Sequence, residues 1–229
     1  MKMSKAESLK KFVFTSLQVG CMLLCVVACN EDENKYIYPP IISELVEVHT
    51  NNQGDCSHLL TDQGTWLTIR NRITMTDSLT KDSVYRCSCR YTLNPDNPNE
   101  AVIYSLRQIP SFHPIAAHSI SEIKSDPLSL QSVWIGGNYL NLALLVKSQK
   151  ENHSYKVVED SLKVFMQGGK TLHLRLYHDA GKDVEAYTQI VYLSVPLYHY
   201  LPILQKGDTI AIGINISGKG WQTWKTPFI

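Results

Sequence analysis

Hydrophobic and polar residues alternate with period two along most of the chain after residue 36, and clusters of Gly, Asn, Asp and Pro interrupt this alternation. This pattern is typical of an all-β protein. The first half is predicted to hold short strands at residues 44–50, 57–61, 65–70, 84–93 and 101–109. Because Pro95 and Pro98 disfavour a strand interior, residues 94–99 are predicted to form an exposed loop.

The spacing of these strands predicts two domains. Five short strands in residues 40–109 favour a small OB-like Greek-key barrel, although periodicity alone does not distinguish it from a small sandwich. Residues 110–126 lack sustained alternation and are predicted to be a connector. Residues 127–229 are predicted to form a two-sheet β-sandwich. Its expected strands are residues 128–135, 139–147, 154–158, 171–177, 186–195 and 209–216.

The N-terminus has the layout of an export signal. Four lysines among the first eleven residues precede 17 uncharged residues, 12–28. Small or branched residues then lead to Cys29, as a lipoprotein signal peptidase requires. We therefore expect residues 1–28 to be a cleaved signal peptide and Cys29 to be lipidated, with palmitate among its acyl chains. An uncleaved signal anchor, or lipidation at Cys21 or Cys25, is the alternative.

A polar segment follows the predicted lipid anchor. Residues 30–35 are rich in acidic and amide side chains, so residues 29–39 are expected to be a flexible tether. The acidic run resembles the signal with which Bacteroides-type bacteria send lipoproteins to the outer face of the outer membrane. The expected location is therefore the outer membrane, lipid-anchored and facing the exterior.

Charge and cysteine content narrow the classes of function. The chain has 22 basic and 21 acidic residues, of which four Lys and one Glu lie in the leader, so the mature chain has 18 and 20 and a net charge of −2. This balance argues against a nucleic-acid partner. Cys87 and Cys89 are expected on one face of a strand as buried thiols. A bridge from Cys56 to either one stays open.

Several ordered motifs resemble the NigD-like lipoprotein family. They lie at residues 62–65, 84–86, 132–142, 172–179, 192–197 and 207–210. The resemblance covers residues 40–228, is strongest in the C-terminal half, and implies an N-terminal OB-like domain and a C-terminal β-sandwich. It implies little chemistry: the family takes its name from a bacteriocin operon, in which gene neighbourhood led one member to be proposed as the immunity component. Residues 218–221 depart from the family's usual final turn and leave the last strand undecided.

The sequence holds few signs of catalysis. Residues 168–171 end like a P-loop, but Val164 replaces its leading glycine and a strand is expected to follow. The chain also lacks a nucleophile elbow, a His-Glu-x-x-His pair and a dinucleotide fingerprint. We predict that the protein is not an enzyme and needs no cofactor.

The candidate binding residues lie in the C-terminal half. His173, Arg175 and Tyr177 are expected to point outward from one strand, as a ligand-binding strip or as an ordinary sheet surface. Trp221 and Trp224 are the other candidates, for stacking on sugars or, with Phe228, for closing the end of the sandwich.

Residue types suggest two further kinds of site. His173, His178, Asp179 and Asp183 carry metal-ligand side chains, but the composition of residues 178–183 favours a hairpin loop, and no metal is predicted. Asp-Ser/Thr-aliphatic triplets resemble the O-glycan acceptors of Bacteroides-type bacteria. The candidate acceptors are Ser78, Ser83, Ser161 and Thr209.

Together these features predict a non-catalytic lipoprotein that binds a protein, a peptide such as a bacteriocin, or a glycan. The alternative is a structural or assembly subunit of an outer-membrane complex. The partners expected are the membrane, through the N-terminal lipid, and that unknown ligand. The ectodomain is expected to be monomeric.

Overall fold

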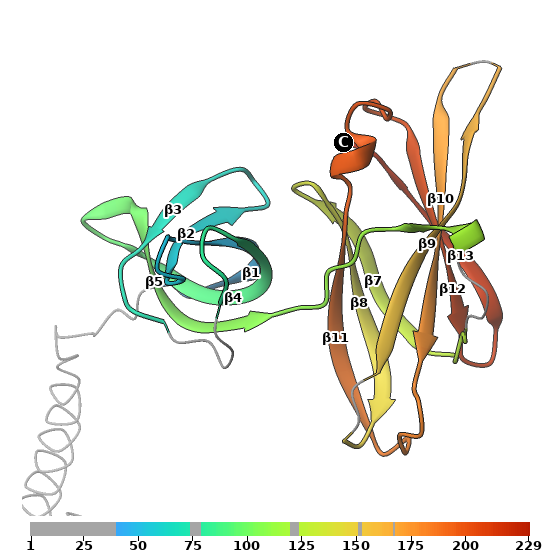
Figure 1. Ribbon diagram of the computed structural model, residues 1–229, viewed down its shortest axis with the longest axis horizontal. Coiled ribbons are helices and arrows are strands. Elements are labelled where there is room, and N and C mark those ends of the chain that lie inside the picture. Colours follow the sequence, from blue (N-terminus) through green and yellow to red (C-terminus); the bar gives the residue numbers. More distant parts are fainter. Residues whose placement is uncertain (1–39, 74–78, 120–123, 151–152, 167) are drawn as a thin grey trace, which may run out of the picture. The chain divides into compact units, whose positions relative to one another are not determined.

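The computed structural model describes residues 40–73, 79–119, 124–150, 153–166 and 168–229. Residues 40–229 form one compact unit. The regular elements of the described residues are β-strands and two short 3-10 helices (Figure 1). The all-β class predicted from the sequence is confirmed.

The first five strands close into a barrel. They are β1 (Ile42–Thr50), β2 (Cys56–Thr61), β3 (Trp66–Ile69), β4 (Val84–Asn94) and β5 (Asn97–Gln108). The order around the barrel is β1-β2-β3-β5-β4, and β4 pairs with β1 to close it. Only the β3–β5 contact is parallel within this barrel. This order is the OB-like arrangement that the strand pattern predicted.

Alternation along these strands fills the barrel interior. The buried residues come mainly from every second position, because successive side chains of a strand point to opposite faces. They are Val46, Val48, Leu59, Leu67, Cys87, Cys89, Tyr91, Ala101 and Ile103. Cys56, Cys87 and Cys89 are free thiols. Burial raises the pKa of Cys87 and of Cys89 to about 12.

The loop predicted at residues 94–99 is wrong in extent. β4 continues to Asn94 and β5 begins at Asn97, so the two strands form a tight hairpin. Asn94 pairs with Asn97, but Leu93 pairs with Ala101, and the three intervening residues of β5 bulge away from β4. Pro98 lies in this bulge, where its missing N–H costs no hydrogen bond to β4.

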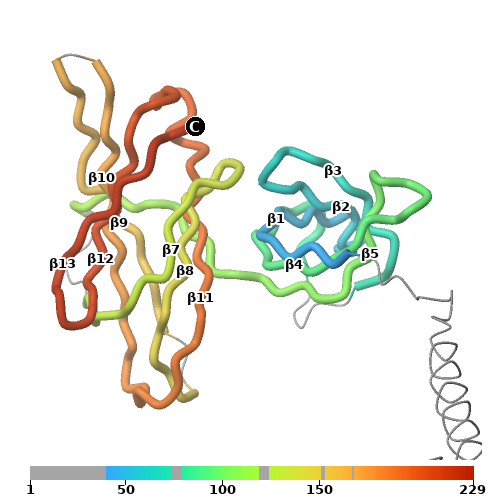
Figure 2. The backbone as a smooth tube through the Cα atoms, turned by 180° about the vertical axis from the view of Figure 1, so that it is seen from behind, coloured from blue at the N-terminus to red at the C-terminus, as the bar shows by residue number. Residues whose placement is uncertain are grey.

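The remaining strands form the two sheets of a sandwich. They are β6 (Ile115–Ala116), β7 (Ser129–Gly136), β8 (Tyr139–Ser148), β9 (Ser154–Val164), β10 (Lys170–Asp179), β11 (Tyr187–Pro196), β12 (Thr209–Ile216) and β13 (Gly220–Pro227). The 3-10 helices are η1 (Ala117–Ser119) and η2 (Tyr198–Tyr200). One sheet has the order β13-β12-β10-β9-β6 and the other β11-β8-β7. Figure 2 shows the same strands from behind.

Three elements of the sandwich differ from the expected strands. β9 runs six residues past the predicted end at 158. The undecided final segment forms β13, which pairs with β12 along its whole length. The segment predicted as a connector contributes β6, which pairs in parallel with β9. Two-residue strands of this kind are too short to show a period in the sequence.

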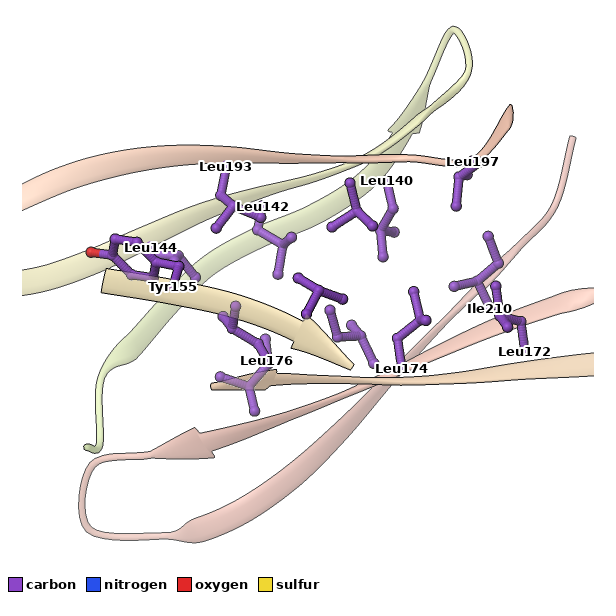
Figure 3. Close-up of a cluster of buried hydrophobic side chains, with 14 of the residues drawn as sticks. Leu140, Leu142, Leu144, Tyr155, Leu172, Leu174, Leu176, Leu193, Leu197 and Ile210 are labelled. Carbon is purple, nitrogen blue, oxygen red and sulfur yellow. The ribbon is translucent and has the colours of Figure 1, made fainter. Parts of the chain in front are cut away.

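Leucines dominate the core between the two sheets. Leu172, Leu174 and Leu176 of β10 are at most 2% exposed, so the inward face predicted for this strand is confirmed. They face the side chains of β8 and β11 from the other sheet (Figure 3). The core is completed by alternate residues of β12, namely Ile210, Ile212, Ile214 and Ile216.

Candidate functional site

Three of the predicted binding residues lie together on the outward face of the five-stranded sheet. His173, Arg175 and Tyr177 are half-buried and alternate with the core leucines of β10. β12 lies parallel to β10 and places Gly213 beside Arg175. A Cβ on Gly213 would lie 3.7 Å from Cγ of Arg175 and 3.8 Å from Cε3 of Trp221. The two large side chains therefore cover the glycine between them.

Arg175 is the centre of this outward group. Its guanidinium lies 5.2 Å from the Trp221 ring centroid, within the range of a cation–π contact. It also donates a hydrogen bond of 3.2 Å to the Tyr177 hydroxyl. The rings of Tyr177 and Trp221 meet edge to face at 5.6 Å. Trp221 nevertheless keeps 45% of its surface exposed.

A bulge in β9 supplies the acidic partner of Arg175. The pairing of β9 with β10 shifts between His173 and Leu174, which leaves Asp160 without a paired residue on β10. Asp160 Oδ2 lies 2.8 Å from Nη2 of Arg175. Bulges commonly redirect a side chain in this way. We call Asp160, Arg175, Tyr177 and Trp221 the aromatic–arginine platform.

Lysines flank His173, at one end of the platform. The pKa of His173 is lowered by burial and by the positive charges of Lys163 and Lys225. A histidine with a lowered pKa is neutral at pH 7, so the two lysines carry the positive charge on this part of the face. Arg175 adds a third cation.

Trp224 does not join this group. It pairs across from Ile212 and packs against the sandwich core, whereas Trp221 pairs across from Asn215. The two tryptophans are three positions apart on one strand, so they point to opposite faces. Phe228 is also buried in this core. The sequence therefore named five candidates, and the structure brings four of them onto one surface.

A second polar group lies near the hairpin that follows β10. Nδ1 of His178 lies 3.0 Å from the backbone oxygen of Asp126, and Nε2 lies 2.8 Å from Nδ1 of His153. Nε2 of His153 lies 3.2 Å from Asp183. Carbonyl and carboxylate oxygens only accept, so all three contacts are hydrogen bonds only when the two imidazoles share one extra proton.

Local contacts favour the neutral form of His178 and the charged form of Asp183. Burial lowers the pKa of His178, and Tyr155 stacks on its ring at 5.2 Å. The hydrogen bond from Ser148 and those from two backbone amides hold the pKa of Asp183 well below its usual range.

The side chains of His153, His178 and Asp183 serve a structural role, because they bond to one another and to the fold. Each imidazole nitrogen already has a hydrogen-bond partner, so none is left to bind a cation. The four residues that the sequence offered as metal ligands also lie apart. His173 lies on the outward face of the sheet, beside the platform, whereas His178 is buried. Within the described ranges, no three His, Cys, Asp or Glu side chains are grouped closely enough to hold a metal.

A third polar group surrounds Arg86 of β4, whose side chain is 1% exposed. Its two terminal nitrogens donate to both oxygens of Asp62, at 2.7 and 2.9 Å. It also donates to Oδ1 of Asn141 and Oγ of Ser194. Its guanidinium lies 4.1 Å from the Tyr139 ring centroid. Arg86 thus joins Asp62 of the barrel to residues of β8 and β11.

Two glycines let Asp62 reach this position. A Cβ on Gly136 would lie 2.2 Å from Oδ2 of Asp62, which is closer than atoms can approach. Gly137 has a φ of 55°, in the left-handed region that favours glycine, and closes the β7–β8 hairpin. We call Asp62, Arg86, Asn141 and Ser194 the arginine cluster.

The predicted modification sites lie in different settings. Ser83 is half-buried just before β4, and its hydroxyl donates to the backbone oxygen of Lys81. Ser161 and Thr209 lie within β9 and β12. Ser78 and Cys29 fall outside the described residues. No helix in the described part of the chain is long and apolar enough to cross a membrane.

Comparison with known proteins identifies the family. The family model of the NigD-like C-terminal β-sandwich domain matches residues 111–227. A NigD-like immunity protein from Bacteroides caccae is 30% identical in sequence, with a TM-score of 0.65, over 83% of this chain and 94% of that chain. The chain belongs to the NigD-like family. No curated protein matches its sequence.

A more distant structure shares the same fold. A protein of unknown function from Bacteroides vulgatus is 14% identical to this NigD-like chain, with a TM-score of 0.63. The match covers 83% of this chain and 92% of that chain. At this identity the similarity shows the fold alone.

The sequence motifs that carried the NigD-like resemblance meet at the arginine cluster. Asp62, Arg86 and Asn141 come from three of those motifs, and Ser194 comes from a fourth. Sequence reasoning missed this convergence because up to 108 residues separate the partners. The available signal was an arginine predicted within a strand, since a buried guanidinium requires a carboxylate partner.

Proposed function

We propose that this NigD-like protein is a non-catalytic binding protein, anchored by lipid at Cys29 to the outer membrane and facing the exterior. Its role is bacteriocin-immunity-like, with a protein or peptide as ligand. The observation that carries the proposal is the aromatic–arginine platform, where Trp221 is held by Arg175 and Tyr177 yet stays 45% exposed. Trp, Tyr and Arg are the residues most enriched at the energetic centres of protein interfaces.

The geometry of the platform supports binding because its side chains are already ordered. Arg175 has an acidic partner and two aromatic neighbours before any ligand arrives. Ordering side chains in advance lowers the entropy lost on association. The buried pair of His153 and His178 offers no comparable site, because all of its ring nitrogens are engaged within the fold.

Trp221→Ala tests the binding role, with Trp66→Ala as the matched control. Trp66 is 51% exposed and lies on the barrel, outside the platform. A deletion strain is challenged with culture supernatants of bacteriocin-producing Bacteroides-type strains and complemented with each variant at equal surface level. We expect wild type and Trp66→Ala to protect and Trp221→Ala to fail. Equal protection by both variants would contradict the platform as the binding site.

The lipid anchor is tested separately. Radiolabelled palmitate should be incorporated by the wild-type protein and not by Cys29→Ala, and protease added to intact cells should remove the wild-type protein. Labelling that persists in Cys29→Ala would assign the lipid to another cysteine. A chain untouched by protease on intact cells would place it on the inner side of the membrane.

A glycan is the second candidate ligand. The exposed ring of Trp221 is a flat apolar surface on which a sugar ring can stack, and Asp160 and Arg175 offer hydrogen-bonding groups beside it. A glycan array probed with wild type and Trp221→Ala distinguishes the two candidates. Binding to an array sugar that Trp221→Ala abolishes would favour the glycan.

A further inference from the structure

One end of the sandwich gathers exposed apolar side chains. β9 ends and β10 begins there, and so does β12, because Thr171 of β10 pairs with Thr209. β13 ends there, where Pro227 pairs with Thr209. In both backbone views the β9–β10 hairpin extends past the other strands of its sheet at this end (Figures 1 and 2).

The hairpin carries the most exposed of these residues. Val164, Phe165 and Met166 expose 69%, 54% and 106% of their surface. The loop before β12 adds Leu201 and Ile203 at 42% and 38%. Exposed large apolar residues that occur singly are ordinary, but a contiguous group marks an interaction surface.

Contacts at the base hold these two segments together. The Lys170 ammonium donates to the backbone oxygen of Ile203, and the Lys170 amide donates to Asp208 at 2.7 Å. Asp208 also accepts from the Gln205 amide at 2.8 Å. The base of the hairpin therefore lies against the loop before β12. We call the exposed apolar residues of these two segments the apolar end.

The exposed side-chain charges of the hairpin and of the loop at the apolar end are positive. Lys163 and Lys206 are exposed, and Lys170 lies at the base. The only carboxylate described in residues 163–170 and 201–208 is Asp208, which is buried and bonded to backbone amides. An apolar projection surrounded by lysines complements a surface that is apolar inside and anionic outside. An anionic lipid membrane has this arrangement.

The hairpin backbone also suits entry into a membrane interface. The Phe165 amide donates to the Gly169 carbonyl at 3.1 Å, and the Gly168 amide donates to the Phe165 carbonyl at 3.0 Å. Backbone groups that are paired within the hairpin cost less to remove from water than free ones. A projecting tip, unlike a groove, needs no partner of complementary shape.

From these observations we infer that the apolar end docks on an anionic lipid surface, with Phe165 and Met166 entering the interface and Lys163 and Lys206 beside the headgroups. This contact would be a second membrane attachment, distinct from the lipid at Cys29. This inference rests on the proposed membrane anchoring, but vesicle binding can be measured on a chain that lacks the lipid.

Vesicle flotation of residues 40–229 tests the inference, since this compact unit has its own two cores. The vesicles contain equal parts of phosphatidylglycerol and phosphatidylcholine, or phosphatidylcholine alone. We expect binding to the mixed vesicles that Phe165→Ser/Met166→Ser weakens by about tenfold or more. Lys163→Gln/Lys206→Gln and added salt should weaken it as well.

The matched control is Tyr187→Ser/Ile190→Ser on β11, since these residues are 68% and 50% exposed but lie away from the apolar end. This control should float like wild type, and thermal melting of each variant verifies folding. Absent flotation, equal loss in the control, or equal binding to phosphatidylcholine alone would overturn the inference. Self-association that Phe165→Ser/Met166→Ser abolishes would also overturn it, in favour of a second copy.

This test is independent of the proposed ligand site. Trp221→Ala should float normally, and Phe165→Ser/Met166→Ser should keep the platform's ligand. Failure of flotation therefore refutes membrane docking without touching the binding role, and loss of protection in Trp221→Ala alone leaves membrane docking intact.

Discussion

Removing the carboxylate of Asp62 should destabilise the protein severely. In Asp62→Ala, the Arg86 guanidinium stays buried but loses both of its charge-assisted hydrogen bonds. Each such bond contributes about 1.5–3 kcal/mol. Neutral acceptors on Asn141 and Ser194 and the Tyr139 ring remain in place. We therefore expect a loss of about 3–5 kcal/mol in the free energy of unfolding, typical of an orphaned buried charge.

Urea denaturation and calorimetry measure this loss. For a chain of this size, the expected fall in Tm is about 6–20 °C. The matched control is Glu185→Gln, which breaks the exposed Lys147–Glu185 ion pair and should change stability by less than about 1 kcal/mol. The double variant Asp62→Leu/Arg86→Met should be more stable than Asp62→Ala, because no charge is left buried.

Two results would refute this reasoning about the arginine cluster. A loss below about 1 kcal/mol in Asp62→Ala would mean that water or the remaining acceptors compensate the guanidinium. A double variant no more stable than Asp62→Ala would mean that the cluster acts through side-chain shape and not through charge.

Three further outcomes are expected. Gly136→Ala should cost about 1–3 kcal/mol in urea denaturation, because its Cβ would displace the Asp62 carboxylate. The pKa of His178 is lowered by folding, so this group binds more protons in the unfolded chain below about pH 6.5. Its contribution should lower the free energy of unfolding as the pH drops from about 7 to 5, and the slope should be shallower in His178→Gln. Cys87 and Cys89, with pKa values of about 12, should resist iodoacetamide at about pH 8 until the protein is unfolded.

Each of these outcomes has its own control. Gly213→Ala, whose Cβ meets no atom closer than 3.7 Å, should be tolerated in the same assay. His113→Gln, at an exposed position, should leave the pH slope unchanged. A pH slope that is unchanged in His178→Gln, or labelling of Cys87 in the folded state, would contradict the burial of these groups.

Much of the fold could be predicted because period-two alternation is local. The inward row of Leu172, Leu174 and Leu176 follows from a single strand, without knowledge of its neighbours. The bulge that frees Asp160 could not be predicted in this way, since it depends on how β9 pairs with β10. Pro98 misled the prediction for the same reason, because the bulge that tolerates it belongs to a pair of strands.

Part of the candidate site could be predicted from the sequence for the same physical reason. Outward residues of β10 could be named from its alternation, but the partner of Arg175 on β13 could not. Trp224 was grouped with Trp221 because they are close in sequence, and strand geometry then placed them on opposite faces. The arginine cluster required contacts between residues 55 and 108 positions apart, which no local pattern contains.

If the chain is exported as we propose, the order of the arginine cluster along it has a consequence for folding. A chain that crosses a membrane from its N-terminus delivers Asp62 and Arg86 first, and these two residues alone already neutralise each other. Asn141 and Ser194 arrive later, as β8 and β11 emerge. The barrel can thus form around a compensated charge while half of the chain is still in transit. When β8 and β11 emerge, the Arg86 guanidinium is already in place to donate hydrogen bonds to Asn141 and Ser194. This shortens the search that long-range β pairing otherwise requires.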